Sequence, residues 1–357
     1  MKNILVYAQD LGGAQNVALV ARELAKEIEA DMTIIVHPLA KTVFDEFRLP
    51  FQLITQQGFN LPLGEKQARQ FLDSGGFTHI FCGTSNQHYD PSNSNIIQGA
   101  RQQGIRCFGL LEHWKGWDRF YNERGALAYV PDILGCIDAF SAAELEQMGV
   151  SRERLAIVGH PYLEWVYKQM EAGVFYNQDR RRKVIGLISQ PLVSRNFESM
   201  LNTPIESTSL IERIAKIFGE LQSDFDFAVF YRPHPKERRL AAIPDGVILN
   251  EQQRWIDVLK DVDVVVGLDS MALIEAFFAG KKCISLKLPE LEGISDMNCP
   301  FQFSVPVRSL EQFALVVASA LRGDAGAFPR LEDQRGLVVS SIKRCTKALH
   351  AFFNTKW

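Results

Sequence analysis

The sequence has no long apolar run, no closely spaced cysteine pair and no large excess of charge of either sign. Apolar runs too short to cross a bilayer argue against membrane-spanning helices. Six cysteines scattered without a CxxC pair argue against a zinc site or a disulfide framework. With 39 basic and 42 acidic residues the formal charge is −3, so we expect no nucleic-acid partner. A peripheral contact with a membrane surface stays open.

Two common phosphate-binding signatures are missing from the first strand-to-helix junction. A strand-like run at 3–8 leads into Gln9-Asp10-Leu11-Gly12-Gly13, and this stretch is neither GxGxxG nor GxxxxGK[ST], since no lysine follows Gly13. The glycines still predict a tight turn, where backbone N–H groups can approach a ligand at a helix N-terminus. We therefore treat Gly12 and Gly13 as candidate phosphate contacts and Asp10 as a candidate base.

Strand-like and helical stretches alternate along the whole chain, which predicts parallel, doubly wound α/β sheets. A length of 357 residues favours two domains. The polar and basic segment around 178–183 is the natural linker. We expect an N-terminal domain at 1–177 and a second domain at 183–330. The segment 331–357 ends in a helix that is expected to pack back on the first domain.

An unusual loop follows the strand-like run at 107–111 and reads Glu112-His113-Trp114-Lys115-Gly116-Trp117. It combines a carboxylate, an imidazole and two indoles. Aromatic rings beside acid–base groups suit a sugar face or a base ring, through stacking and hydrogen bonds. We take Glu112 and His113 as catalytic candidates and expect Trp114 to face the ligand. The alternative is that the tryptophans fill a core or an interface.

Cationic groups gather after a strand of the second domain, in Arg232-Pro233-His234-Pro235-Lys236. The prolines restrict this loop, and the cations lie where ligands meet parallel sheets. Such groups suit a diphosphate, because arginine binds oxygens bidentately and histidine or lysine can stabilise leaving-group charge. Arg232 and His234 are therefore candidate phosphate ligands.

The stretch 264–286 predicts a strand, a turn, a helix and a second strand. Asp269 or Ser270 is placed to cap the helix, whose free N–H groups would face a ligand. Glu275 lies one to two turns inside it. Ser189 ends an earlier strand of the same domain and is added to the candidate phosphate site.

The motifs Tyr231-Arg232-Pro233-His234-Pro235-Lys236 and Gly267-Leu268-Asp269-Ser270 resemble the "RPHP" and "DSS" segments of the GT-B glycosyltransferase superfamily. Ile274-Glu275-Ala276 and Gly280-Lys281 continue the second motif, and Val158-Gly159-His160-Pro161 resembles the "GxP" element. The resemblance is strongest to the branch of UDP-GlcNAc 2-epimerases and of CDP-glycerol and capsule-polymer transferases. It implies two Rossmann-like domains facing each other across a cleft, the first for the acceptor and the second for the nucleotide sugar.

Carried over by position, the resemblance assigns phosphate contacts to Arg232 and His234 and phosphate or sugar contacts to Asp269 and Ser270. Glu275 would hold the ribose. The leading hypothesis is a glycosyltransferase of polysaccharide biosynthesis, with a UDP- or CDP-linked donor, no cofactor and no metal. Its acceptor would be a glycan, a lipid-linked compound or a small molecule.

The alternatives are a nucleotide-sugar 2-epimerase or hydrolase on the same scaffold, and a non-catalytic scaffold that binds a glycan or a partner protein. We expect a cytoplasmic protein that is soluble or peripheral to the inner face of the membrane. The base remains one of Asp10, Glu112 and His113, and the oligomeric state is open.

Overall fold

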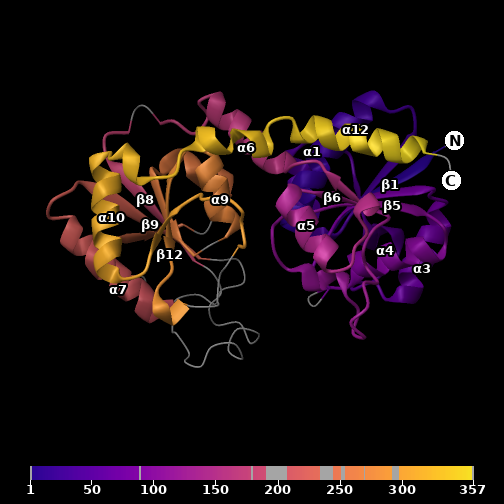
Figure 1. Ribbon diagram of the computed structural model, residues 1–357, viewed down its shortest axis with the longest axis horizontal. Helices are drawn as coiled ribbons and strands as arrows, with labels where there is room; N and C mark the ends of the chain where they lie inside the picture. Colours follow the sequence, from indigo (N-terminus) through magenta and orange to yellow (C-terminus); the bar gives the residue numbers. More distant parts are fainter. Residues whose placement is uncertain are drawn as a thin grey trace. The chain divides into compact units, whose positions relative to one another are not determined.

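The chain folds into two compact units, each built around its own parallel sheet (Figure 1). The first unit comprises Met1–Glu164 and Gly336–Trp357, and the second comprises Trp165–Arg335. The first boundary falls inside helix α6 (Pro161–Glu171), upstream of the polar segment around 178–183. The computed structural model describes residues 2–87, 90–177, 180–189, 207–233, 244–250, 254–268, 270–291 and 297–355.

In the described part of the first unit, seven strands form one sheet in the order β3-β2-β1-β4-β5-β6-β7, with every pair parallel. The strands are β1 (Asn3–Ala8), β2 (Asp31–Val36), β3 (Gln52–Leu53), β4 (His79–Gly83), β5 (Arg106–Leu110), β6 (Ile133–Cys136) and β7 (Leu155–Ile157). The strand order reverses direction between β1 and β4. In doubly wound sheets such a reversal marks the ligand-binding edge.

Both faces of the first sheet are covered, which is why its strands read as nearly continuous apolar runs. Ile80 and Cys107 pack on one face with α3 and α4, whereas His79 and Phe108 contact Phe352 of α12 on the other. Helix α12 also lies beside α1 (Figure 1). The helices are α1 (Leu11–Glu27), α2 (Lys41–Glu46), α3 (Glu65–Gly75), α4 (Ser92–Gln102), α5 (Ala139–Gln147) and α12 (Ser341–Asn354).

The described strands of the second unit form a six-stranded parallel sheet in the order β10-β9-β8-β11-β12-β13, which reverses between β8 and β11. The strands are β8 (Lys183–Ile188), β9 (Phe227–Arg232), β10 (Val247–Leu249), β11 (Val264–Gly267), β12 (Lys282–Leu286) and β13 (Val305–Val307). The helices are α7 (Ser207–Leu221), α8 (Trp255–Val258), α9 (Met271–Phe278) and α10 (Leu310–Arg322), and the short helix α11 (Arg335–Val338) spans the second boundary between the units.

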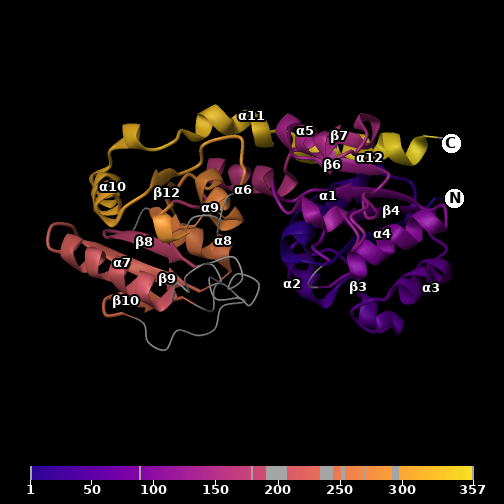
Figure 2. The ribbon, with the colours of Figure 1, turned by 60° about the horizontal axis from the view of Figure 1, so that its bottom comes forward.

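The main core of the second unit lies between the sheet and helices α7 and α10. Phe218 of α7 contacts Phe227 of β9 and Phe313 of α10 edge to face. Figures 1 and 2 show α9 away from this pair of helices, where it packs on β11 and β12. The prediction of two doubly wound α/β domains is confirmed. No helix within the described ranges is long and apolar enough to span a bilayer.

Candidate functional site

The first candidate site lies at the C-terminal ends of β1, β4 and β5, where the first sheet reverses. Asp10 follows β1, Thr84 follows β4 and Glu112 follows β5. Adjacent parallel strands end at the same edge of a sheet, so three separate segments deliver polar side chains to one place. Burial raises the pKa of Glu112, and the negative charge of Asp10 adds to that shift.

Two glycines allow helix α1 to begin next to these strand ends. Asp10 caps α1, and its Oδ1 accepts a hydrogen bond from the Gly13 N–H at 2.9 Å. A Cβ atom added to Gly83 would lie 3.3 Å from the Cα of Gly13, and one added to Gly12 would lie 3.4 Å from the Cγ of Glu112. The Gly13 N–H is thus engaged by Asp10, and the glycines mainly serve this close backbone approach.

Glu112 is a buried carboxylate with two side-chain partners. The Thr84 hydroxyl donates to its Oε2 at 3.1 Å, and the Arg119 guanidinium donates to its Oε1. Only 6% of the residue is exposed. Loss of hydration raises the pKa of Glu112 to about 7, even though Arg119 opposes the shift. A carboxyl group with a pKa near 7 can either accept or donate a proton at physiological pH.

Arg119 is the residue of this site that sequence reasoning missed. Its guanidinium is buried and donates to the carbonyl oxygens of Gly116 at 2.8 Å and of Thr84 at 2.5 Å, besides Glu112. It belongs to a short 3₁₀ turn, Trp117–Phe120, which no periodic pattern of apolar residues predicts. The loop composition alone gave no signal for it, because a single arginine in a polar loop is usually solvated.

His113 lies beside the ion pair as an uncharged ring. Its Nε2 is 2.5 Å from a nitrogen of Arg119 and 3.4 Å from Oε1 of Glu112. Burial and the neighbouring guanidinium hold the pKa of His113 well below its usual value. Taking up a proton here would place two cations in contact. Glu112 is therefore the better candidate for proton transfer.

The prediction that Trp114 faces a ligand was wrong. Trp114 is 1% exposed, and its indole N–H donates to Oδ2 of Asp138 at 2.7 Å. The indole stacks on the ring of His160, with centroids 6.2 Å apart and 21° between the planes. The loop after the apolar strand β5 turns toward the interior. The indole is therefore part of the core that supports Glu112.

His160 completes that support. The ring is buried, and its Nε2 lies 2.9 Å from the carbonyl oxygen of Glu112, while its Nδ1 accepts from the Leu163 N–H at 3.2 Å. Desolvation lowers the pKa of His160 to about 4, so the ring is neutral and donates through Nε2. The backbone of Glu112 is thereby tied to the start of α6.

The second candidate site lies where the second sheet reverses, between β8 and β11. Ser189 follows β8, and its backbone N–H donates to the carbonyl oxygen of Arg232 at the end of β9, at 2.9 Å. The Arg232 guanidinium is half-buried and donates to Oδ1 of Asn250 at 3.3 Å. Burial lowers the pKa of Arg232, which stays charged because arginine is very basic.

Helix α9 begins at the same edge. Its N-cap is Ser270, whose hydroxyl oxygen accepts from the Leu273 N–H at 3.3 Å. The first turn of a helix leaves backbone N–H groups free and carries a partial positive charge. An anion placed before Ser270 would therefore be stabilised.

Glu275 lies just beyond the first turn of α9 and is half-buried. Desolvation raises the pKa of Glu275 to about 8. Its carboxylate accepts no hydrogen bond from any residue in the described ranges. A ligand hydroxyl would supply what this group lacks.

Two predicted phosphate ligands, His234 and Asp269, lie outside the described residues, as does Lys236. The structure therefore places Asp10, Gly12, Gly13, Glu112 and His113 in the first unit, and Ser189, Arg232, Ser270 and Glu275 in the second. Within the described ranges, His, Cys, Asp and Glu side chains form no group of three or more suited to a metal ion.

The sequence matches no protein-family model and no curated protein. Solved structures resemble it over nearly its whole length. A UDP-GlcNAc 2-epimerase from Methanocaldococcus jannaschii has a TM-score of 0.67 at 12% identity, covering 98% of this chain and 100% of that one. The UDP-GlcNAc 2-epimerase from Neisseria meningitidis, solved with UDP-GlcNAc, has a TM-score of 0.66 at 14% identity, covering 99% of both chains.

A glycosyltransferase shares the architecture as well. The lipopolysaccharide outer core galactosyltransferase WaaB has a TM-score of 0.55 at 12% identity, covering 98% of this chain and 99% of that chain. At such low identity these likenesses define the fold alone. The chain has the GT-B fold, as its motifs predicted.

Proposed function

We propose that this protein is an enzyme that acts on a nucleotide-diphosphate sugar, with a glycosyl transfer as its reaction. One observation carries the proposal: a buried carboxylate, Glu112, has its pKa raised to about 7 at the ligand-binding edge of a doubly wound sheet. An ion pair that only stabilises the fold does not need to lie at the ligand-binding edge. Perturbed groups at such edges are typical of active sites.

In this proposal the second unit binds the nucleotide. Arg232 and the N-terminus of α9 bind the diphosphate through charge-assisted hydrogen bonds, and Ser189 adds a hydroxyl. The Glu275 carboxyl group forms a hydrogen bond with a ribose hydroxyl, which suits a group without a partner among the described residues. The cation and the helix dipole stabilise the departing diphosphate, so no metal is required for its charge.

The first unit supplies the proton transfer. Glu112 in its ionised form accepts the proton of the acceptor hydroxyl as that oxygen attacks the anomeric carbon and the bond to the diphosphate breaks. Arg119 and Thr84 hold the carboxylate in one orientation. Neutral His113 and Asp10 act as neighbours that position the acceptor.

Epimerisation at the sugar's C2 is a second candidate, supported by the solved epimerases that share the fold. In that reaction Glu112 would remove or return the proton on carbon, and no acceptor is consumed.

Product analysis separates the two reactions. The chain is incubated with UDP-GlcNAc and a related set of UDP- and CDP-linked sugars, with and without candidate acceptors. Transfer releases the nucleoside diphosphate only when an acceptor is present. Epimerisation changes the sugar in its absence, and release without an acceptor indicates hydrolysis. If no nucleotide sugar is consumed and none raises the unfolding temperature, the proposal fails, since a ligand bound by the folded state must stabilise it.

A further inference from the structure

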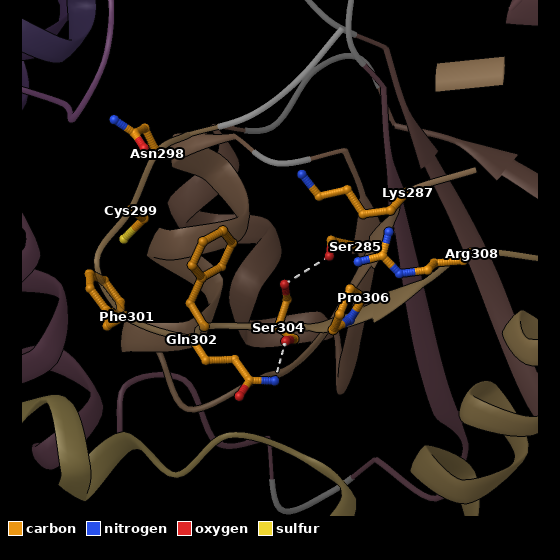
Figure 3. A pocket seen from close by; sticks show the side chains of 10 residues that line it. Ser285, Lys287, Asn298, Cys299, Phe301, Gln302, Ser304, Pro306 and Arg308 are labelled. Atoms are coloured by element: carbon orange, nitrogen blue, oxygen red, sulfur yellow. Dashed lines mark hydrogen bonds between the residues drawn. The ribbon is translucent and has the colours of Figure 1, made fainter. Parts of the chain in front are cut away.

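A pocket of about 540 Å³ lies at the far edge of the second sheet, away from the strands that carry the nucleotide site proposed above. Figure 3 shows its side chains around the C-terminal ends of β12 and β13. The lining residues that the structure describes all belong to the second unit and are Ser285, Lys287, Asn298, Cys299, Phe301, Gln302, Phe303, Ser304, Pro306 and Arg308.

Two cations leave neighbouring strand ends on one side of this pocket. Leu286 pairs with Val307 in the sheet, so Lys287 and Arg308 each follow a paired residue. The Lys287 N–H donates to the carbonyl oxygen of Val307 at 2.8 Å, which fixes the two backbones together. None of the lining residues within the described ranges is acidic. An anion entering here would meet two basic side chains that leave adjacent strand ends.

Arg308 is held at the backbone but not at the side chain. Its N–H donates to Oε1 of Gln312 at 2.7 Å, and the next residue, Ser309, caps α10. The guanidinium makes no hydrogen bond or ion pair with the rest of the described chain. All five of its N–H donors are therefore available to a ligand, and the backbone that carries the side chain is fixed.

The floor of the pocket is made of paired polar groups. The Ser304 hydroxyl donates to that of Ser285 at 3.0 Å, and the Gln302 amide donates to the Ser304 carbonyl oxygen at 3.3 Å (Figure 3). Both serines are at most 5% exposed. Their mutual pairing satisfies the hydroxyl groups of both buried serines.

The side opposite the cations carries an aromatic ring. Phe301 lies across the pocket from Lys287 and Arg308 in Figure 3. It packs on Phe277 and Phe278 of α9, with centroids 6.3 and 6.0 Å away, so its position is fixed by the core. A ring face opposite two cations suits a ligand with an apolar face and an anionic end.

We propose that this pocket binds an acidic sugar, that is, a pyranose bearing a phosphate or a carboxylate. The anionic group pairs with Arg308 and Lys287, and the sugar ring lies toward Phe301. The volume exceeds what an inorganic ion needs. The pocket is about 10 Å along the sheet edge from the β8–β11 reversal, given the spacing of neighbouring strands. The proposal stands independently of the nucleotide site.

Titration calorimetry on the full chain tests this. The ligands are glucose 6-phosphate and glucuronate, which separate the two anionic groups, with neutral glucose as the reference. At least one acidic sugar is expected to bind more tightly than glucose. Arg308→Gln and Lys287→Gln should each weaken it about tenfold or more, the effect of losing one charge-assisted hydrogen bond.

Two variants serve as controls. Arg330→Gln removes an exposed cation of the same unit that faces Glu332, and Glu275→Gln alters the nucleotide site. Both should bind the acidic sugar as the unaltered chain does. The proposal is overturned if neither acidic sugar binds at up to roughly 10 mM. It is equally overturned if glucose binds as well as they do, or if Arg330→Gln weakens binding as much as Arg308→Gln.

Discussion

The Glu112–Arg119 pair shows how burial can change the chemistry of a single residue. Each partner lies in a region where ionised groups lose hydration, and the attraction between them only partly offsets that loss for the carboxylate. The Thr84 hydroxyl and the carbonyl oxygens around Arg119 supply the remaining hydrogen bonds. The result is a fixed carboxylate whose protonation changes near neutral pH.

Glu112→Gln is expected to lower kcat by about a hundredfold or more, because a general base typically contributes that much. Affinity for the nucleoside diphosphate should stay unchanged, since that site lies in the other unit. Steady-state kinetics and calorimetry measure the two quantities. Glu146→Gln, which removes an exposed carboxylate near Arg152 in the same unit, is the matched control and should retain full turnover.

The pH–rate profile checks the same assignment without any substitution. If Glu112 acts as the base, kcat/KM rises with pH through about 7, because only the ionised carboxylate accepts a proton. A profile that is flat between pH 5 and 8 would remove Glu112 from the chemistry.

Glu275 is expected to make the free energy of unfolding depend on pH. Burial raises its pKa from 4.5 to about 8, so the stabilisation is complete below pH 4.5 and is lost as pH rises through 8. Relative to Glu275→Gln, the unfolding free energy of the unaltered chain should fall by up to about 1.4 kcal/mol per pH unit across that window. Denaturant unfolding at several pH values measures the difference.

A control of opposite sign exists in the same unit. Backbone and Ser309 hydrogen bonds at the start of α10 lower the pKa of Glu311. Its stabilisation is therefore present above pH 4.5 and is lost on acidification, so Glu311→Gln should show no loss between pH 5 and 8. If the difference in unfolding free energy between the unaltered chain and Glu275→Gln does not change between pH 5 and 8, burial does not raise the pKa of Glu275.

At the level of elements, helices α9 and α10 start in the same way but at different places. Ser270 and Ser309 both accept a backbone hydrogen bond from the third residue on. Ser270→Ala and Ser309→Ala should each cost about 1 kcal/mol of stability, the usual value of an N-cap. Only Ser270→Ala should also weaken nucleoside diphosphate binding, which calorimetry measures. Equal diphosphate affinity in the two variants would move the phosphate away from α9.

Most of the elements could be predicted from the sequence, because period and capping signals agree along them. The stretches Asn3–Ala8, Ser207–Leu221 and Met271–Phe278 begin and end where their patterns indicate. Strand β13 could not be predicted, because three residues centred on Pro306 show no alternation of apolar and polar residues and a proline disfavours strands. It lies at the sheet edge, where Pro306 needs no ladder hydrogen bond on its outer side.

The candidate sites were less predictable than the fold. Asp10, Glu112 and Ser270 follow buried strands and Arg232 is the last residue of β9, and such positions are readable from an apolar run followed by polar residues. The direction of a side chain cannot be read from the sequence. For this reason Trp114 was predicted to face a ligand, although it packs on His160. Arg119 owes its role to a turn that folds back on Glu112, a tertiary effect without local pattern.

On the scale of the whole molecule, the C-terminal helix is part of the first unit. The Arg106 guanidinium donates to the Phe352 carbonyl oxygen at 2.7 Å and lies 4.2 Å from the centroid of its ring. Glu164 accepts from the N–H groups of Ser340 and Ile342 at 3.2 and 2.7 Å, so the returning chain is anchored at both ends of α12.

Phe352→Ala should destabilise the first unit by about 3–5 kcal/mol, because the ring is buried against Phe108 and His79. Hydrogen exchange of the β4 and β5 amides localises the effect to that unit. Lys347→Ala, on an exposed position of the same helix, should change stability by no more than about 0.5 kcal/mol. Exchange rates that are equal in the two variants would show that α12 does not hold the first sheet.

The proposed nucleotide site is tested by a calorimetric titration of UDP and of uridine into the unaltered chain and the Arg232→Ala variant, with CDP and cytidine as the parallel pair. We expect one diphosphate to bind the unaltered chain and Arg232→Ala to weaken that binding by roughly ten- to a hundredfold. Affinity for the bare nucleoside should not change. Unaltered diphosphate affinity in the variant, or no binding of either diphosphate, would contradict a nucleotide-sugar site at the reversal of the second sheet.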